Sequence, residues 1–111
     1  EPLAAYNKEW GEFTTAIGMQ AMQNIDNVGA ASVDYLMYSG YVTLAYFWAA
    51  MAAVAQQKLD EGTSEEDFYK AKIATARFYF KRILPRAAGH KGAAEGGLDC
   101  LMELDEEHFA F

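Results

Sequence analysis

The sequence predicts an all-α fold, an up-down bundle of three long helices with a kinked fourth helix after Pro85 and a short C-terminal tail. Three observations support this fold class. Apolar residues recur at alternating spacings of three and four along most of the chain, which is the period of one helix face. Proline occurs only twice in 111 residues. No segment alternates between apolar and polar residues as a half-buried strand would.

The length and composition limit residues 1–111 to one small domain with a single core. Hydrophobic residues make up 52% of the chain, which predicts a packed domain and argues against disorder. The net charge of −7 disfavours a nucleic-acid partner, because a phosphate backbone selects clustered Lys and Arg. The single cysteine, Cys100, excludes an internal disulfide and fits a reducing, cytoplasmic location.

The opening Glu-Pro-Leu has no initiator Met or signal peptide, so we expect a domain excised from a longer protein.

The first predicted helix covers the N-terminal segment as far as a break at residues 26–29. The break reads Asp26-Asn27-Val28-Gly29, in which Asn27 or Asp26 is a suitable N-cap for the following helix. Six residues at helical spacing form the predicted core stripe of the first helix: Leu3, Tyr6, Trp10, Phe13, Ile17 and Ala21.

The second predicted helix is apolar on two faces, so we expect it at the centre of the bundle with neighbours on both sides. The first of these faces comprises Ala30, Val33, Met37, Gly40, Leu44, Phe47, Met51 and Val54. The second face comprises Tyr38, Tyr41, Ala45, Ala49 and Ala52. The many alanines would let neighbouring helices approach closely.

Residues 35–55 contain no charge and, as a helix, would extend about 30 Å, enough to cross a bilayer. Spanning helices collect Trp and Tyr at their ends, whereas here the aromatic residues run through the middle. We therefore expect a buried helix of a bundle and no membrane span. The aromatic residues could line a ligand cavity, but their helical spacing favours a place in the core: Tyr35, Tyr38, Tyr41, Tyr46 and Trp48.

The third predicted helix begins after Gly62, a glycine that can end the second helix in the left-handed conformation. Ser64 and Asp67 are spaced like a capping box, although Asp stands where Glu or Gln is usual. Glu65 and Glu66 add negative charge to the first turn, which the helix dipole favours. The predicted core stripe is Tyr69, Ile73, Ala76, Phe80 and Ile83, with Phe68, Thr75 and Tyr79 beside it.

Pro85 is expected to kink this helix or to begin a fourth, because proline cannot donate a hydrogen bond to the residue four positions back. The fourth helix can continue from Arg86 to Glu95. The pair Gly96-Gly97 should stop it. Residues 98–111 are then expected to form a helical turn and a tail.

No group of residues in the sequence predicts a catalytic, cofactor-binding or metal site. The nearest approach to the Glu-x-x-His pairs of metal-binding bundles is Asp105-Glu-Glu-His108, on the acidic tail. We interpret His108 and His90 as two separated, solvent-facing histidines. Cys100 has acidic neighbours that disfavour a thiolate, so a small buried or half-buried thiol is expected. The glycines follow no strand, so no nucleotide-binding fingerprint applies.

Three segments of the sequence together resemble a known family. The most specific is Phe68–Pro85, with the pattern FYxAKxxTARFYFxxxLP, and the others are Asp34–Trp48 and Leu104–Phe111. They are similar to the helical domain appended to a branch of bacterial acyl-CoA dehydrogenases, the acetyl-CoA dehydrogenase-like C-terminal domain. With the helical spacing between them, these segments cover most of the chain.

The resemblance implies a flavoprotein parent in fatty acid metabolism. In that parent, FAD and a carboxylate base remove two hydrogens across the α–β bond of an acyl-CoA thioester and give the 2,3-enoyl-CoA. The flavin-binding and base positions of the family belong to the preceding domains, and no residue here matches them. The resemblance further implies two partners, the main body of the parent enzyme and a second subunit of a homo-oligomer.

Seven of the nine basic residues of the chain gather between residues 70 and 91. Arg77, Lys81 and Arg82 are the ones whose spacing brings them closest to a shared face. They could contact an anionic partner, such as a phosphate of coenzyme A or an acidic surface of the parent enzyme. They could instead form a solvated face that pairs with Asp99–Glu107 or with Glu65 and Glu66. The full set is Lys70, Lys72, Arg77, Lys81, Arg82, Arg86 and Lys91.

Two functions of different classes remain open at this point. The chain could be a non-catalytic enzyme domain that contributes packing, assembly or the shape of the substrate entrance. It could also be an autonomous helical module that binds another protein. The first function predicts a flat, exposed apolar patch, and the second predicts a concave groove with a polar rim. A bundle that holds a cofactor in its own core is a third possibility, which absorbance of the purified protein would reveal.

Overall fold

The computed structural model describes residues 2–109, and within them the chain is helical, as the sequence predicts. Glu1 lies outside the described residues, as do Ala110 and Phe111, which end the third segment of the family resemblance. The main helices are α1 (Pro2–Gln23), α2 (Asp26–Glu61), α3 (Glu66–Phe78) and α4 (Arg86–Ala94). A π-helical turn, η1 (Tyr79–Ile83), joins α3 to α4, and the tail holds α5 (Asp99–Met102) and a 3-10 turn, η2 (Glu106–Phe109).

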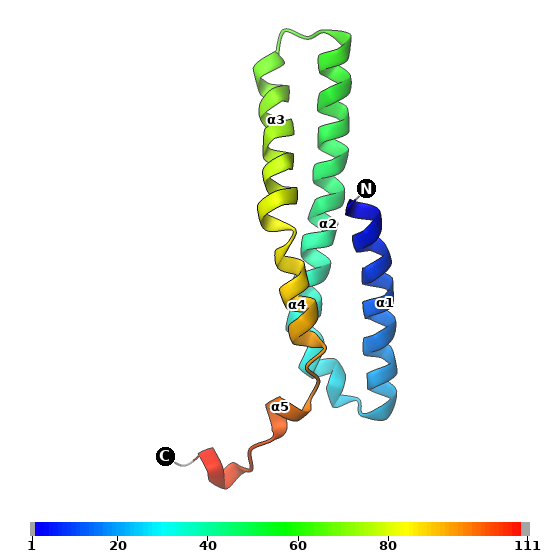
Figure 1. The fold of residues 1–111 in the computed structure, drawn as a ribbon, viewed down its shortest axis with the longest axis vertical. Helices are drawn as coiled ribbons and strands as arrows, with labels where there is room; N and C mark the ends of the chain where they lie inside the picture. The colour runs from blue at the N-terminus through cyan, green and yellow to red at the C-terminus, as the bar shows by residue number, and fades with distance from the viewer. Residues whose placement is uncertain (1, 110–111) are drawn as a thin grey trace.

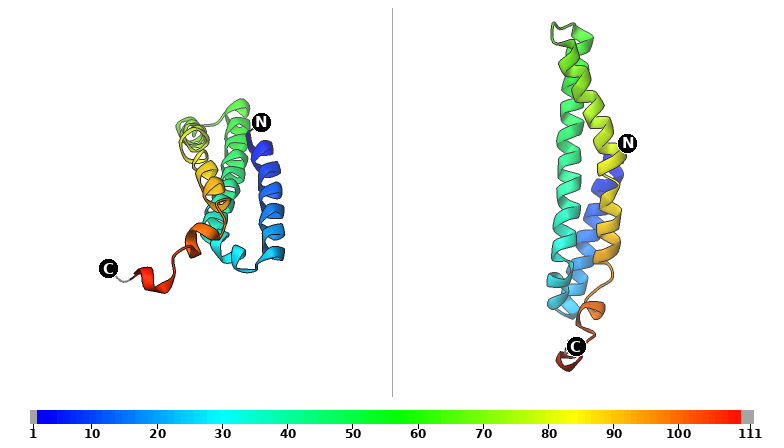
Figure 2. Two further views of the ribbon diagram at one scale, coloured as in Figure 1. Left: turned by 60° about the horizontal axis from the view of Figure 1, so that its bottom comes forward. Right: turned by 90° about the vertical axis from the view of Figure 1, so that its left-hand side faces the viewer.

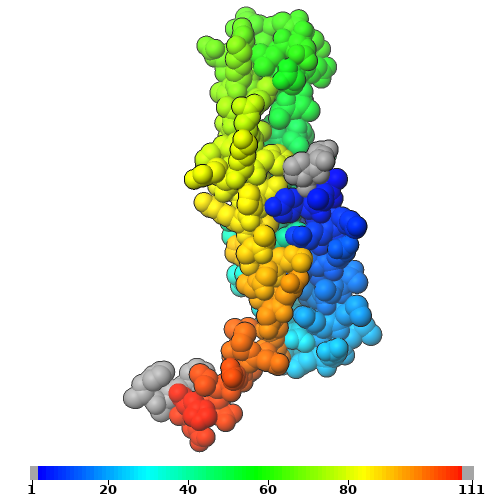
Figure 3. Space-filling view, viewed as in Figure 1, coloured from blue at the N-terminus to red at the C-terminus, as the bar shows by residue number. Residues whose placement is uncertain are grey.

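The central helix of the structure is α2, and the other main helices pack against one side of it. α1 runs antiparallel along the first half of α2, α3 returns along the second half, and α4 continues beside the first half (Figure 1). Seen edge-on, α2 forms one edge of the structure, with α1, α3 and α4 on the other side (Figure 2). The space-filling view looks onto the side where these three helices cover α2 (Figure 3). One end is therefore a three-helix bundle and the other a two-helix hairpin.

The described chain is long and thin. Its radius of gyration is 19.5 Å and its extents are 67 × 33 × 15 Å, whereas a compact domain of this size has a radius of gyration of about 13 Å. Helical domains bury their apolar stripes between packed layers. A structure with helices on only one side of α2 leaves the other side of that helix without a covering layer.

Two clusters of buried side chains form the core. The first joins α1, α2 and α4, and Phe13 meets Tyr38 edge to face there with ring centroids 5.1 Å apart. The second lies at the junction of α1, α2 and η1 and contains Leu3, Ala45, Tyr79 and Leu84. All six residues of the predicted α1 stripe are buried or half-buried, so that prediction is confirmed.

The ends of the helices differ in part from the prediction. The first break lies at Asn24–Ile25 and not at residues 26–29, and neither Asp26 nor Asn27 is the N-cap. Instead the N-cap position is Ile25, which has no side-chain cap, and the side chain of Asn24 accepts a hydrogen bond from the Asp26 N–H at 3.0 Å. An Asx-type turn one residue earlier thus takes over the role expected of the cap.

The loop before α3 also differs from the prediction. The capping box of Ser64 and Asp67 is wrong, because the N-cap position is Glu65 and carries no side-chain hydrogen bond. Thr63 accepts a hydrogen bond from the Glu65 N–H and so occupies the turn that Ser64 was expected to form. Gly62 ends α2 as predicted and has a positive φ of 87°, although its ψ of 127° differs from that of the left-handed helical conformation.

The α3 stripe is confirmed, with Tyr79 more deeply buried than predicted and Phe68 and Thr75 exposed. Pro85 interrupts the helix as expected, and the interruption includes the π-helical turn η1. The Leu84 N–H donates to the carbonyl oxygen of Tyr79, five residues back, at 2.9 Å. In a regular α-helix residues five apart point about 140° away from each other. The wider turn lets Tyr79 and Leu84 both face the core.

Residues 35–55 lie within α2, and their aromatic residues enter the core with one exception. Tyr38 is fully buried, and Tyr35, Tyr41 and Trp48 pack against the two clusters. Tyr46 is 59% exposed, so its predicted place in the core is wrong. α1 begins at this level of α2 and does not reach further, which leaves Tyr46 uncovered. None of the helices in residues 2–109 combines the length and hydropathy that crossing a lipid bilayer requires.

The burial of Tyr79 in the core should make the stability of the protein depend on pH. Its hydroxyl donates to the carbonyl oxygen of Tyr41, and burial, with a smaller contribution from Tyr41, raises the pKa of Tyr79 to about 12 from 10.0. Folding therefore favours the protonated phenol, and this contribution is complete below pH 10.0 and is lost as pH rises towards about 12. We expect the free energy of unfolding to fall across this window, and to fall less in Tyr79→Phe. Urea unfolding at a series of pH values measures both proteins, and parallel profiles would contradict the assignment.

Candidate functional site

The side of α2 that faces away from the other helices carries a strip of exposed apolar side chains, which we call the α2 apolar face. Its seven members are between 38% and 70% exposed: Val33, Leu36, Met37, Leu44, Phe47, Met51 and Val54. At 3.6 residues per turn these positions fall within an arc of about 100° around the helix. With a rise of 1.5 Å per residue they extend about 30 Å along it.

Most of this strip belongs to the first face of the second helix, which the sequence predicts to be buried. That prediction is wrong for this chain, although the second face is buried as expected, with Tyr38 and Ala45 fully so. α1, α3 and α4 all pack on the side rich in tyrosine and alanine, where short side chains allow close approach. Among residues 2–109 no helix remains to cover the opposite side.

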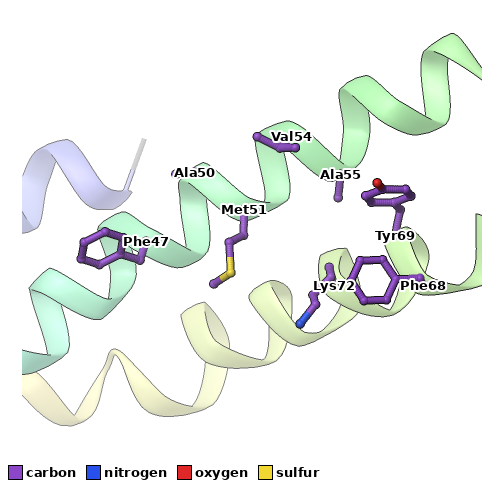
Figure 4. Close-up of a pocket in the computed structure, with 8 residues that line it drawn as sticks. All are labelled: Phe47, Ala50, Met51, Val54, Ala55, Phe68, Tyr69 and Lys72. Carbon is purple, nitrogen blue, oxygen red and sulfur yellow. The ribbon is translucent and has the colours of Figure 1, made fainter. Parts of the chain in front are cut away.

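A groove between α2 and α3 borders the α2 apolar face near its C-terminal end. Its volume is about 360 Å³, and its only charged lining residue is Lys72 (Figure 4). The Lys72 ammonium lies 5.3 Å from the centroid of the Phe68 ring, a cation–π arrangement that keeps the charge at the rim. The lining residues are Phe47, Ala50, Met51, Val54 and Ala55 of α2 and Phe68, Tyr69 and Lys72 of α3.

A second groove lies between α1 and α2 at the other end of the face. Its volume is about 660 Å³, and its polar groups are hydroxyls. The hydroxyls of Thr14 and Tyr35 are hydrogen-bonded to each other at 2.7 Å, while the buried Ser39 Oγ has no partner among the described residues. The two grooves extend the apolar surface of α2 onto its neighbours.

Two polar contacts tie the helices together behind this face. The buried Tyr38 hydroxyl donates to Glu9 Oε1 at 2.7 Å, and burial, followed by this hydrogen bond, raises the pKa of Tyr38. His90 Nδ1 lies 2.9 Å from Asp34 Oδ1, with both side chains 29% exposed. The prediction that His90 faces solvent is therefore wrong. Asp34 is the single charged residue of α2 between Asp26 and Lys58. A lone charge in an apolar helix needs a hydrogen-bonding or ionic partner when it is buried, so the sequence contained a signal for this contact.

The candidate metal ligands and the cysteine lie on the C-terminal tail. The ligand atoms of Asp105, Glu107 and His108 lie within 4.8 Å of one another, and all three residues are exposed. His108 thus faces solvent as predicted. The prediction of a buried or half-buried thiol at Cys100 is wrong, because the α5 turn that carries it projects from the bundle and leaves the thiol exposed.

Three of the seven clustered basic residues have local partners. Lys70 forms an ion pair with Glu66, one of the two acidic residues suggested as partners, and their hydrogen bond raises the pKa of Lys70 and lowers that of Glu66. Lys91 lies 2.7 Å from Glu95, and that hydrogen bond raises the pKa of Lys91. Lys72 contacts the Phe68 ring.

The other four basic residues are exposed, and we call them the basic band: Arg77, Lys81, Arg82 and Arg86. None of them takes part in an ion pair among residues 2–109. The predicted pairing of the basic residues with Asp99–Glu107 is therefore wrong within this chain. The physical reason is that the tail leads away from the bundle after Gly97 and does not turn back along α3 (Figure 1).

Comparisons with known proteins show which family the chain belongs to. The sequence matches the family model described as acetyl-CoA dehydrogenase C-terminal like over residues 1–105. It is 35% identical over 96 residues to the broad-specificity linear acyl-CoA dehydrogenase FadE5 of Mycobacterium tuberculosis. That alignment covers 82% of this chain and 16% of the mycobacterial protein. No solved structure gives a significant match. The chain thus belongs to the family of C-terminal domains found in acyl-CoA dehydrogenases.

Proposed function

We propose that residues 1–111 are the C-terminal domain of a longer, FAD-dependent acyl-CoA dehydrogenase and dock on the body of that enzyme through the α2 apolar face. The parent would oxidise an acyl-CoA thioester to the 2,3-enoyl-CoA. The domain would serve packing, assembly or the shape of the substrate entrance. The single observation that carries the proposal is the exposed strip of seven apolar residues on one side of α2.

An exposed apolar strip of this length is unfavourable in water. Burying one large aliphatic or aromatic side chain contributes about 1.5–3 kcal/mol. The seven residues are aligned over several helical turns with no charge between Asp34 and Lys58 to interrupt them. A contiguous apolar surface of this kind is typical of an interface. The thin shape of the chain supports the same conclusion, because a second layer on this side would complete the bundle.

The described residues do not fit the flavin itself. FAD needs donors for a pyrophosphate, commonly backbone N–H groups of a glycine-rich turn at a helix N-terminus. Both grooves are mostly apolar, and Lys72 is the only cation among their lining residues. The proposal therefore assigns the flavin and the base to the rest of the enzyme and gives this domain no step of the reaction.

An autonomous helical module that binds another protein is the alternative function. The observation in its favour is the α2–α3 groove, which has an apolar floor and a Lys72 rim. The two functions differ in what covers the strip. In the first it is buried in the enzyme itself, and in the second it stays free until a partner binds.

Leu44→Lys tests the proposed function. In the isolated chain Leu44 is about half exposed, so we expect the free energy of unfolding to change by no more than about 0.5 kcal/mol. In the full-length gene product the lysine would be an unpaired charge in an apolar contact. We expect the domain to detach there, with a lower Tm and rapid cleavage by trypsin at the domain junction. Differential scanning fluorimetry and limited proteolysis measure the two effects.

Gln57→Lys is the matched control, because it places the same side chain on an exposed position of α2 outside the apolar face. This variant should leave both the isolated chain and the full-length product unchanged. If Leu44→Lys behaves like Gln57→Lys in the full-length product, the face is open to solvent there. That result would favour the autonomous module over the docked domain.

A further inference from the structure

We infer that the basic band is the binding surface for the acidic C-terminal arm of a second copy of this chain. The arm is defined here as residues 99–108. This contact goes beyond the proposed docking of the domain on its own enzyme body, because it joins two copies through a different surface. It rests on the charges and exposed apolar side chains of the two segments.

The basic band runs from α3 through η1 into α4, with Arg77 in α3, Lys81 and Arg82 in η1 and Arg86 in α4. Ala76, Tyr79, Leu84 and Ala87 are buried, while the four basic side chains at the intervening positions are exposed. Phe78 lies among them and is 56% exposed. The band therefore offers positive charge together with one aromatic contact, and both lack a partner among residues 2–109.

The arm has the complementary composition. It contains five carboxylates and no Lys or Arg: Asp99, Glu103, Asp105, Glu106 and Glu107. Three apolar side chains alternate with them and are 57% to 70% exposed, namely Leu101, Met102 and Leu104. Burial of these apolar side chains in any apolar contact is favourable. The nearby carboxylates make a basic surface the preferred partner for that contact.

The arm points away from the band of its own chain. After Gly97, with φ of 76°, the chain leaves the end of the bundle and continues outward (Figures 1 and 3). The net charge of the chain is −7, although the band contributes four positive charges. The band is therefore a positively charged patch on a protein that is acidic overall. A second copy supplies both the acid and the apolar residues that the band lacks. The α2 apolar face lies on the side of α2 that α3 and α4 leave uncovered, so it stays available to the enzyme body.

Carbodiimide cross-linking of a mixture of copies tests this inference directly. Full-length protein labelled with ¹⁵N is mixed with unlabelled protein in about 1 M salt, which releases ionic contacts between copies, and is returned to about 0.1 M salt. The mixture is then treated with a zero-length carbodiimide, which joins a lysine amine to a carboxylate. We expect cross-linked peptides between Lys81 and the arm in which one half is heavy and the other light. Their yield should fall when salt is raised from about 0.1 M to about 1 M, because the Debye length shortens from about 10 Å to about 3 Å.

Charge exchange separates a specific contact from a general attraction. Arg77→Glu with Arg82→Glu in one chain, or Glu103→Lys with Glu106→Lys, should each abolish the mixed-isotope Lys81 link. Mixing the two variants should restore it, because opposite charges again face each other. A Lys8→Glu variant changes an exposed cation on α1, outside the band, and should have no effect.

Two outcomes would overturn the inference. Lys81–arm links that are only all-heavy or all-light would mean that the arm folds back on its own chain. The absence of any Lys81–arm link would mean that the arm binds elsewhere. Neither outcome bears on the docking of the α2 apolar face, which the Leu44→Lys variant tests separately.

Discussion

Tyr38→Ala is expected to lower the free energy of unfolding by about 3–5 kcal/mol, the range observed when a large buried aromatic side chain is truncated. Tyr38 is fully buried where α1, α2 and α4 meet. Its ring packs edge to face on Phe13, and its hydroxyl donates to Glu9. The substitution removes the ring contact, leaves a cavity between the helices and deprives a half-buried carboxylate of its donor. Urea unfolding followed by circular dichroism measures the loss.

Tyr46→Ala is the matched control for this prediction. It makes the same chemical change on the same helix, with the same effect on helix propensity, but at a side chain that is 59% exposed. We expect a change of no more than about 0.5 kcal/mol. Tyr38→Phe should fall between the two, because it keeps the ring and loses one hydrogen bond, a loss of about 1 kcal/mol. Equal effects of Tyr38→Ala and Tyr46→Ala would mean that the core is placed wrongly.

Leu84→Ala is expected to lower the free energy of unfolding by about 2–5 kcal/mol. Leu84 is buried to 99% at the point where the π-helical turn ends, in contact with the cluster of Leu3, Ala45 and Tyr79. Together with Tyr79, this side chain anchors the α3–α4 connection to α2, and the alanines around it cannot expand to fill the space. The loss should therefore lie in the upper part of the range for leucine truncation.

Leu44→Ala provides the comparison for Leu84→Ala in the isolated chain. Leu44 is exposed on the α2 apolar face, so the same truncation there should change stability by no more than about 0.5 kcal/mol. Urea midpoints of both variants, measured on the same chain with the same slope, give the difference. In the proposed full-length enzyme the two positions should become more alike, since docking buries Leu44 as well.

The sequence alone predicts most of the helical architecture. The stripe of α1 from Leu3 to Ala21, the glycine stops at Gly62 and Gly97 and the interruption at Pro85 follow from local rules, and the structure agrees with each. These features depend on residues only a few positions apart. The errors at Asn24–Ile25 and at Ser64 are shifts of one or two residues, where several short polar side chains compete for the same turn.

The candidate surface could be predicted only in part. The two apolar faces of α2 are visible in the sequence, because the spacing of Val33, Leu44 and Met51 on one side and of Tyr38 and Ala45 on the other is regular. Which face is covered within the chain is not visible there. Both faces have the same helical periodicity. The hydrophobic effect is not directional, so it favours burial of either face and does not specify which one the other helices cover.

The sequence by itself determined that the chain is helical, that it belongs with the C-terminal domains of acyl-CoA dehydrogenases and that its longest helix is apolar on two sides. Only the tertiary structure decided that α1, α3 and α4 share one of those sides and leave the other open. It also joined His90 to Asp34, residues that are 56 positions apart. The reason is common to both: packing is set by contacts between distant segments, and the period of a helix specifies which residues share a face but not what that face meets.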